Sequence, residues 1–547
     1  MERKEETKHF PALLGRWIPN LIPQILAFAS FVGGAILLFS GAVASETGRL
    51  AWLKDAIPLP VIEISHFLGS VTGMLLLLLG RGLQRRLNAA YFLTAILLGG
   101  GILFSLLKGF DYEEAIFLSI MLLALLPFRN YFYRRASLTE ESFTPAWTAS
   151  IMIVIIATWG TGLFFYKHVE YSNDLWWRFA FFENAPRFLR AMVGIVGVSL
   201  FFALSMLLKP ARIKPKLPQI KEMGEARAIA RESKRCSSFL ALLGDKALLF
   251  SQTKRSFIMY GVYGRSWVVL GDPVGPREEW GELIWKFYEL CDIYDGWPVF
   301  WEIPGESLHF YLDLGLTLLK IGEEGKVPLG DFSLEGSSRS ELRQLSRYAE
   351  KEGCVFEIIP PESVPAFLPE FKKISDDWLT RKHTKEKSFS LASFKEDYLK
   401  EFSFAVVKKE GRVIAFGNLW FAGDREEFSL DLMRYSSEAP RNVMDYLFVQ
   451  SMLWESKEGY RWFNLGMAPL AGLKNRQIAP LWNRIGSFIF RYGEHFYNFQ
   501  GVRLFKDKFQ PAWEPKYLAS PGGLALPQIF ADIAALSSGG LRGIFGK

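Results

Sequence analysis

The chain has few of the residues that build disulfide or metal sites. Its 547 residues include only three cysteines and six histidines. The cysteines, Cys236, Cys291 and Cys354, lie far apart and form no Cys-x-x-Cys pair. The sequence therefore predicts neither a disulfide framework nor a structural zinc site, and it favours a reducing compartment.

Several standard catalytic motifs are also absent. The chain contains no Gly-x-x-x-x-Gly-Lys-[Ser/Thr], no Gly-x-Ser-x-Gly and no His-Glu-x-x-His. Nucleotide-driven, serine-esterase and zinc-protease chemistry therefore lose their usual support. His383 and His495 stand in polar contexts, and we expect both to be structural.

Apolar residues are abundant. They make up 50% of the chain, with 15% aromatic and 22% charged residues. This composition excludes a disordered protein and fits poorly with a wholly soluble one, and the length leaves room for a membrane part beside a soluble part. The net charge of +7 suits an anionic partner such as lipid headgroups or RNA, but it does not distinguish them.

Six apolar segments predict a multi-pass α-helical membrane domain at residues 1–208. They are 17–45, 58–80, 87–107, 115–128, 142–166 and 191–208, of which 115–128 is shorter than an ordinary span. Clusters of Lys and Arg precede the first segment and follow the second, fourth and sixth. These clusters fall on one side only if all six segments cross, which places both termini and the soluble part in the cytoplasm.

After a basic, Pro-punctuated linker at 209–236, strands and helices recur in one order. A hairpin, a turn, a helix and a strand are expected over residues 246–303. A hairpin around Glu410-Gly411, a further strand, a helix and a strand are expected over 404–466. The repeated order predicts a duplicated α/β domain.

A basic helix is predicted between the two copies. Ser338 and Glu341 have the spacing of a capping box, and a basic residue recurs at every fourth position. These basic residues are Arg339, Arg343, Arg347 and Lys351. Such a face is either solvated or tracks a phosphate backbone.

Polar residues gather near expected strand ends in the second copy. Asp431 and Arg434 have opposite parity in an ideal strand, so both serve one site only if the strand ends or bulges between them. The alternative is a structural ion pair. The remaining members of the group are Asn464, Gly466, Arg503, Lys506 and Lys508. The last three alternate with aromatic residues, which is typical of an anion-binding edge or of a core.

The motifs GDPVG, DFSLEGSSRSELRQLSR, SDDWL, KEKSFSLASF, DLMR, MDYLF, FNLGMAPL and YNFQGVRLFKDKFQPAWEPKYL occur in this order. Together they resemble the phosphatidylglycerol lysyltransferase family, also called multiple peptide resistance factor, over residues 237–520. The resemblance implies two tandem GNAT-like acyltransferase folds. It divides the soluble part into a first domain at 237–338, a connecting helix at 339–352, a second, catalytic domain at 353–525 and a tail at 526–547.

The resemblance also implies an activity. Family members transfer an amino acid from aminoacyl-tRNA to a glycerol hydroxyl of phosphatidylglycerol in the bacterial cytoplasmic membrane. The product lowers the negative charge of the membrane and confers resistance to cationic antimicrobial peptides. Lysyl is the first expectation and alanyl the second. Because the ester is already activated, no cofactor and no metal are expected.

The resemblance also implies roles for individual residues, at the positions that match the family motifs. The resemblance implies that Asp431, Arg434, Lys506 and Tyr398 are catalytic. It implies substrate binding by Lys508, Arg503, Asn464 and Glu494, and tRNA binding by Arg339, Arg343 and Arg347. The sequence leaves open whether Asp431 holds the substrate α-ammonium or accepts the hydroxyl proton.

Two departures from the family accompany these expectations. The chain has Leu391-Ala392 where a glycine is common, and it is expected to be a short form without the N-terminal flippase spans. A separate flippase and a second copy of the chain are then expected as partners. The alternatives are transfer to another lipid or small acceptor, and a non-catalytic protein that binds tRNA or anionic lipid at the membrane.

Overall fold

The computed structural model describes residues 9–42, 59–134, 215–330, 332–473 and 499–538. The chain divides into a largely helical unit, Met1–Arg212 with Asp292–Asp295, and an α/β unit, Ile213–Cys291 with Gly296–Lys547. Each unit is described by itself.

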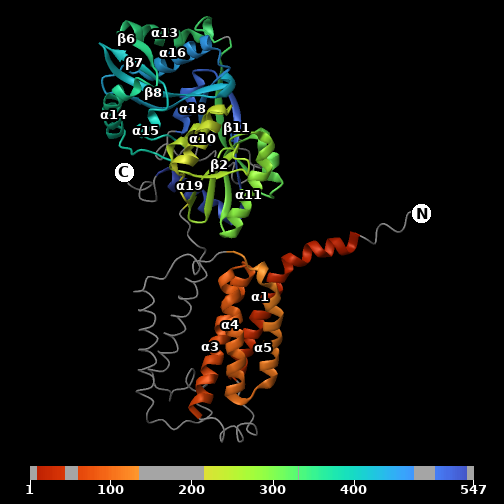
Figure 1. The fold of residues 1–547 in the computed structure, drawn as a ribbon. Coiled ribbons are helices and arrows are strands. Elements are labelled where there is room, and N and C mark those ends of the chain that lie inside the picture. Colours follow the sequence, from red (N-terminus) through yellow and green to blue (C-terminus); the bar gives the residue numbers. More distant parts are fainter. Residues whose placement is uncertain (1–8, 43–58, 135–214, 331, 474–498, 539–547) are drawn as a thin grey trace, which may run out of the picture. The chain divides into compact units, whose positions relative to one another are not determined.

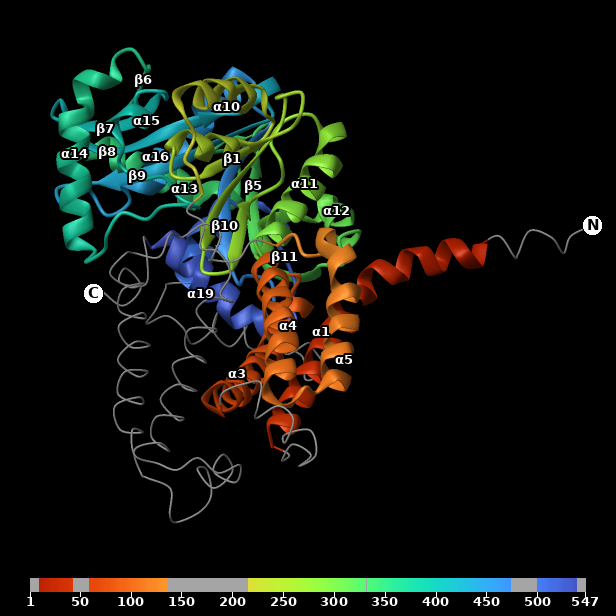
Figure 2. The same ribbon diagram turned by 60° about the horizontal axis from the view of Figure 1, so that its bottom comes forward.

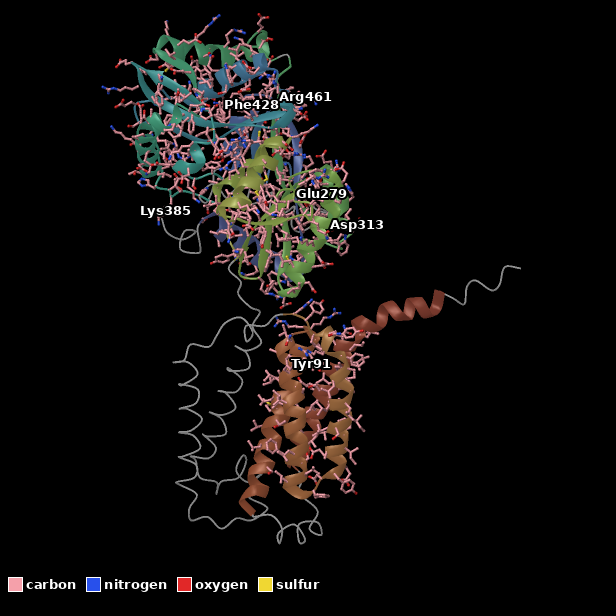
Figure 3. All side chains as sticks on the ribbon, viewed as in Figure 1. Tyr91, Glu279, Asp313, Lys385, Phe428 and Arg461 are labelled. Carbon is pink, nitrogen blue, oxygen red and sulfur yellow. The ribbon has the colours of Figure 1, made fainter. Side chains whose placement is uncertain are left out.

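The described part of the helical unit is built from consecutive apolar helices (Figure 1). They are α1 (His9–Ala42), α3 (Leu59–Gln84), α4 (Asn88–Gly109) and α5 (Tyr112–Leu125), followed by the short η1 (Leu126–Tyr131). α1 packs on α3 so closely that a Cβ at Gly34 would lie 2.6 Å from the carbonyl oxygen of Gly73. Tyr91, labelled in Figure 3, ties α4 to η1 by donating a hydrogen bond to the Leu126 carbonyl at 3.0 Å.

These helices coincide with four of the six predicted membrane segments. Among the described residues, one helix is long and apolar enough to cross a membrane, at Asn88–Leu107 within α4. The apolar stretches Leu21–Leu37 and Val71–Gln84 are shorter. The predicted segments 142–166 and 191–208 lie outside the described residues, so the multi-pass topology stays a prediction.

The α/β unit contains an 11-stranded sheet with the order β1-β2-β3-β4-β11-β5-β10-β9-β8-β7-β6. The strands are β1 (Ala247–Phe250), β2 (Phe257–Tyr263), β3 (Ser266–Leu270), β4 (Trp297–Pro304), β5 (Thr317–Pro328), β6 (Cys354–Ile359), β7 (Phe404–Lys409), β8 (Arg412–Phe421), β9 (Glu427–Tyr435), β10 (Trp462–Pro469) and β11 (Ala512–Ser520).

The predicted repetition is visible in this sheet. In the first copy, β1, β2 and β3 are antiparallel, and α11 (Trp280–Ile293) leads to β4, which is parallel to β3. In the second copy, β7, β8 and β9 are antiparallel, and α16 (Val443–Glu458) leads to β10, which is parallel to β9. The turn at Glu410-Gly411 has φ of +51° and +78°, as a tight hairpin requires.

The two copies share one sheet, which differs from the domain boundaries expected from sequence. β11 lies in the expected second domain, yet it pairs with β4 and β5 of the first. Residues Leu526–Ser537 of the expected tail form helix α19, which packs on β2 and β3 and buries Ile529 and Ile533. The expected linker contains α10 (Ile220–Glu232). These strands are far apart in the sequence, so no local sequence pattern predicts that they pair.

Separate hydrophobic clusters lie on the two faces of the β7–β9 region. α14 (Val364–Arg381) lies alongside β8 and β9 (Figure 2), and its Phe371 stacks on Phe404 and Phe416. The other cluster includes residues of α16 and of α13 (Ser340–Lys351), with Phe428 stacked on Phe463. α13 begins after a 3₁₀ turn with Arg339 as its N-cap and has no side-chain cap, so the expected capping box of Ser338 and Glu341 is not formed.

Candidate active site

A bulge in β9 brings Asp431 and Arg434 to the same face of the sheet. Gly417 of β8 pairs with Met433, whereas Leu419 pairs with Leu430, so β9 carries one extra residue between these pairs. The Leu432 N–H donates to Asn418 Oδ1 at 2.7 Å within the bulge. Because the extra residue reverses the alternation of side chains, the bulge, and not a strand end, is how the two residues serve one face.

The Asp431 side chain is half-buried, and its carboxyl group accepts two hydrogen bonds. Tyr398, on the short helix α15 (Glu396–Leu399), donates to Oδ2 at 3.3 Å, and the Ala392 N–H donates to Oδ1 at 3.4 Å. Tyr398 in turn accepts a hydrogen bond from Trp420 Nε1–H at 2.9 Å. Burial raises the pKa of Asp431 to about 7, against the opposing effect of these hydrogen bonds and of nearby cations. The carboxyl group is therefore close to half ionised at neutral pH.

Arg434 supplies a partly buried cation on the same face. Its guanidinium lies 4.3 Å from the centre of the Trp378 ring and donates to Glu386 Oε2 at 3.3 Å. Burial lowers the pKa of Arg434, while Glu386 and Asp431 oppose that change. An arginine so held has the geometry to recognise a phosphate or carboxylate group.

Lys506 and Asn464 hold a second irregular segment, in β10. The β10–β5 register shifts between Asn464 and Met467, and Gly466 between them has a φ of +75°. Lys506 Nζ donates to the Gly466 and Met467 carbonyls at 2.9 and 2.8 Å, and the Gly466 N–H donates to Asn464 Oδ1 at 2.8 Å. Burial lowers the pKa of Lys506 to about 8, while Glu324 and Glu302 oppose that change.

The other residues expected to bind substrate make local pairs. Lys508 Nζ lies 3.0 Å from Asp445 Oδ1. Arg503 pairs with Glu323 at 2.6 Å and stacks 3.5 Å from the centre of the Trp513 ring. Arg503 and Lys506 lie on helix α18 (Phe499–Asp507), which corrects the expectation that they stand at a strand end. Glu494 lies outside the described residues.

The three arginines of the predicted basic helix differ in their surroundings. Arg339 donates to the Phe509 carbonyl at 3.0 Å, and Arg343 donates to the Gly336 carbonyl at 3.1 Å and to the Leu334 carbonyl. Arg347 is exposed to solvent. Two of the three side chains thus hold the backbone around α13, and Arg347 is the one best exposed for a partner.

Sequence reasoning missed a set of buried charges in the middle strands. Lys516 of β11 lies 3.0 Å from Glu324 of β5, and Lys326 lies 3.8 Å from Glu427 of β9. Glu302 stands at a bulge of β4 with a φ of +66°, and burial raises its pKa to about 7. The available signal was the run of charged residues inside the strand 317–328, which is uncommon for a central strand.

The fold and site define a class of protein: an α/β protein with two similar halves in one sheet, and a half-buried carboxyl group at a strand bulge, hydrogen-bonded to a tyrosine. Residues 226–520 match the model of the family described as phosphatidylglycerol lysyltransferase, C-terminal. The chain belongs to this family, as its motifs predict.

Two curated relatives carry the same family name. A phosphatidylglycerol lysyltransferase of Bacillus subtilis is 32% identical over 510 residues, which cover 91% of this chain and 58% of the relative. One of Staphylococcus aureus strain COL is 33% identical over 282 residues, covering 51% of this chain and 33% of the relative. The matched region is thus little more than half of the first relative and a third of the second.

Two solved structures resemble the α/β part. The C-terminal domain of a putative lysylphosphatidylglycerol synthetase from Agrobacterium fabrum is 39% identical, with a TM-score of 0.54, and the match covers 59% of this chain and 99% of that chain. L-PGS from Bacillus licheniformis is 34% identical, with a TM-score of 0.52, covering 60% and 99%.

Proposed function

We propose that the protein transfers an aminoacyl group from aminoacyl-tRNA to a glycerol hydroxyl of phosphatidylglycerol, with lysyl as the first expectation and alanyl as the second. The observation that carries this proposal is the hydrogen bond from buried Tyr398 to Asp431 on the bulge of β9, in a chain of the phosphatidylglycerol lysyltransferase family. The two halves follow the strand and helix order expected of tandem GNAT-like folds.

The reaction is an ester exchange. The glycerol oxygen attacks the carbonyl carbon of the aminoacyl ester, its proton passes to a base, and the bond to the tRNA ribose oxygen breaks as that oxygen takes up a proton. A base works best when its pKa is close to the operating pH. Asp431, with a pKa of about 7, fits the role of proton acceptor. This favours the proton-accepting role over the α-ammonium-holding role that the sequence left open.

The cations of the site fit anionic substrates. Arg434, planar and partly buried, suits the lipid phosphate or the terminal phosphates of tRNA. Lys506 retains donor capacity beyond its two carbonyl partners and assists, with Lys508 beside it on the chain. Arg347 on α13 provides an outer contact for the tRNA acceptor stem. The helical unit is proposed to anchor these domains in a bacterial cytoplasmic membrane, with six spans in all.

The test is a transfer assay with the full chain in phosphatidylglycerol vesicles. Lysyl-tRNA and alanyl-tRNA, labelled in the amino acid, are supplied separately, and label is followed into the lipid fraction. RNase-sensitive label in phosphatidylglycerol is the expected result, and the productive donor identifies the amino acid.

Matched vesicles without phosphatidylglycerol test the acceptor. Transfer to another lipid there would keep the chemistry and change the acceptor. Protein that binds tRNA but labels no lipid from either donor would contradict the proposed function and favour a binding role.

A further inference from the structure

The loop that covers Asp431 is held in a strained conformation. This loop, residues 382–395, connects α14 to α15 and donates the Ala392 N–H to Asp431. Phe389 has a φ of +66°, a region that a bulky side chain rarely adopts, and it is buried. Strain of this kind persists only where surrounding contacts hold it, and it is enriched at functional sites.

The contacts that hold the loop come from the first half of the α/β unit. The Phe389 N–H donates to Asp245 Oδ2 at 3.1 Å, and Asp245 Oδ1 accepts from Lys246 Nζ at 2.6 Å. Both residues lie in the turn before β1. The Phe389 ring lies against β2 at Gly261, where a Cβ would come within 3.0 Å of it.

The same loop is also tied to α19. The Ser388 N–H donates to the Ser537 carbonyl at 3.1 Å, and its hydroxyl donates to the Leu536 carbonyl at 3.0 Å. The loop of the second half is therefore fastened to the turn before β1, to β2 and to α19, all outside the strands that carry Asp431.

Burial of the Lys246 ammonium group in the turn before β1 carries a desolvation cost. Its side chain has no exposed surface, and its remaining polar contact is with the Leu240 carbonyl at 3.0 Å. A buried ammonium group is strongly disfavoured unless it is paired. Burial lowers the pKa of Lys246, and Asp245 opposes that change. An apolar side chain would fill the same space without this cost, so the charge itself calls for a reason.

The Lys246 ammonium pairs with Asp245, and Asp245 holds the Phe389 N–H of the loop that also donates to Asp431. The groups that act on the Asp431 carboxyl are the Ala392 N–H, the Tyr398 hydroxyl and the cations Lys246 and Arg434. Those that act on Lys246 are Asp245, Lys395 and Asp431. Lys395 donates to the Leu243 carbonyl at 2.9 Å, and Arg434 is paired with Glu386.

We propose that Asp245 and Lys246 are positioning residues for the transfer reaction, through which the first half of the unit governs the site on the second. Asp245 fixes the loop that donates to Asp431, and the Lys246 ammonium stabilises the ionised form of Asp431. The proposal rests on the proposed function, because it assigns these two residues to the base of that reaction.

The experiment compares the pH dependence of transfer in Lys246→Met, Asp245→Asn and the double variant, all in the full chain in phosphatidylglycerol vesicles. Loss of the Lys246 cation raises the pKa of Asp431, so the acidic limb of kcat/KM is expected to move up by ~0.5–1 pH unit. Loss of the Asp245 charge removes the partner of the buried Lys246 and lowers the pKa of Lys246 further, so this variant is not expected to move the limb below that of the wild type. Its maximal rate is expected to be several-fold lower, because the loop is loosened.

The double variant removes both charges together, so it avoids a buried unpaired charge and its limb is expected near that of the wild type. Lys254→Met, at an exposed lysine of the same half, is the matched control and should leave the profile unchanged. Tryptophan fluorescence reports the folded fraction of each variant.

An acidic limb that stays in place in Lys246→Met, or a maximal rate that is unchanged in Asp245→Asn, would overturn the proposal and leave the pair a purely structural role. If Lys246→Met does not fold, the maximal rate of Asp245→Asn decides: a several-fold fall supports the proposal and an unchanged rate overturns it. Wild-type protein that transfers no label would instead refute the proposed function, so the two failures are distinguishable.

Discussion

The two halves of the α/β unit follow the same order of strands and helix but differ in what they bury. β3 is a regular strand of five buried residues, Ser266–Leu270, whereas the corresponding β9 carries a bulge and the Asp431 carboxyl group. The buried face of α11 is made of Leu283, Ile284, Phe287 and Cys291, whereas α16 buries Asp445 and Glu455 among its apolar residues.

This difference suggests that the two halves have different roles. In the first half, β3 and α11 pack as an apolar support, and this half reaches the site through the turn before β1. The corresponding β9 and α16 of the second half instead carry Asp431 and Glu455, whose pKa burial raises, which is typical of functional sites. The following experiments test that contrast, beginning with the largest expected effect.

Replacing Asp431 with Asn should lower kcat for transfer by about 10²–10⁴-fold, because a general base contributes a factor of that size. Binding of tRNA should stay near the wild-type level. The measurement is label transfer at saturating aminoacyl-tRNA. Asp313→Asn, at an exposed aspartate of the first half that is labelled in Figure 3, is the control and should retain activity. Unchanged turnover in Asp431→Asn would remove Asp431 from the mechanism.

The pH profile of the wild type should be bell-shaped. Activity rises as Asp431 ionises near pH 7 and falls as Lys506 loses its proton near pH 8. At pH 9 the rate should therefore lie about tenfold below the fully protonated Lys506 limit. In Lys506→Arg the cation persists at high pH, so the falling limb should disappear while the rising limb stays. A falling limb common to both proteins would show that another group titrates there.

Glu455 should make the stability of the protein depend on pH. Both its carboxyl oxygens are buried without a hydrogen-bond partner among the described residues, and burial raises its pKa from 4.5 to about 8. The folded state thus keeps a proton that the unfolded state releases, so this group lowers the free energy of unfolding as pH rises from 4.5 to 8.

Glu455→Gln should remove this decrease in the free energy of unfolding with rising pH. Relative to the wild type, the variant should gain roughly 1–3 kcal/mol between pH 5 and pH 8, measured by urea unfolding of the detergent-solubilised full chain. Glu289→Gln changes an exposed glutamate on α11 of the first half and should show no such gain. An equal gain in both variants would contradict the contrast between α11 and α16.

Arg347→Ala should have the smallest effect. Loss of one exposed phosphate contact is expected to raise KM for aminoacyl-tRNA by about two- to fivefold and to reduce its salt dependence, with kcat unchanged. Lys221→Ala, at an exposed cation on α10, is the control. A KM equal to that of the control would remove α13 from the tRNA surface.

Much of the fold was predictable because it depends on neighbours in sequence. The hairpin at Glu410-Gly411, the helix at Val443–Glu458 and the strand that contains Asp431 all follow from turn residues and apolar spacing. The α1, α3, α4 and α5 helices follow from their apolar runs. The family motifs also pointed to Asp431 and Tyr398, which the structure joins by a hydrogen bond.

The other features of the fold and of the site depend on contacts between residues that are far apart in the sequence. The bulge that unites Asp431 with Arg434 involves Asn418 on the neighbouring strand, and the insertion of β11 between β4 and β5 joins residues 186–219 positions apart. Lys506 was expected at a strand end, yet it lies on α18.

By itself, the sequence determined which segments are apolar, where turns and helices begin, and to which family the chain belongs, because these properties act over a few residues or reside in ordered motifs. Only the tertiary structure decided which charges are buried. Asp431, Lys246 and Glu302 owe their altered pKa values to burial. That burial is created by strands and loops far away in the chain, since desolvation depends on every atom packed around a group and not on its neighbours in sequence.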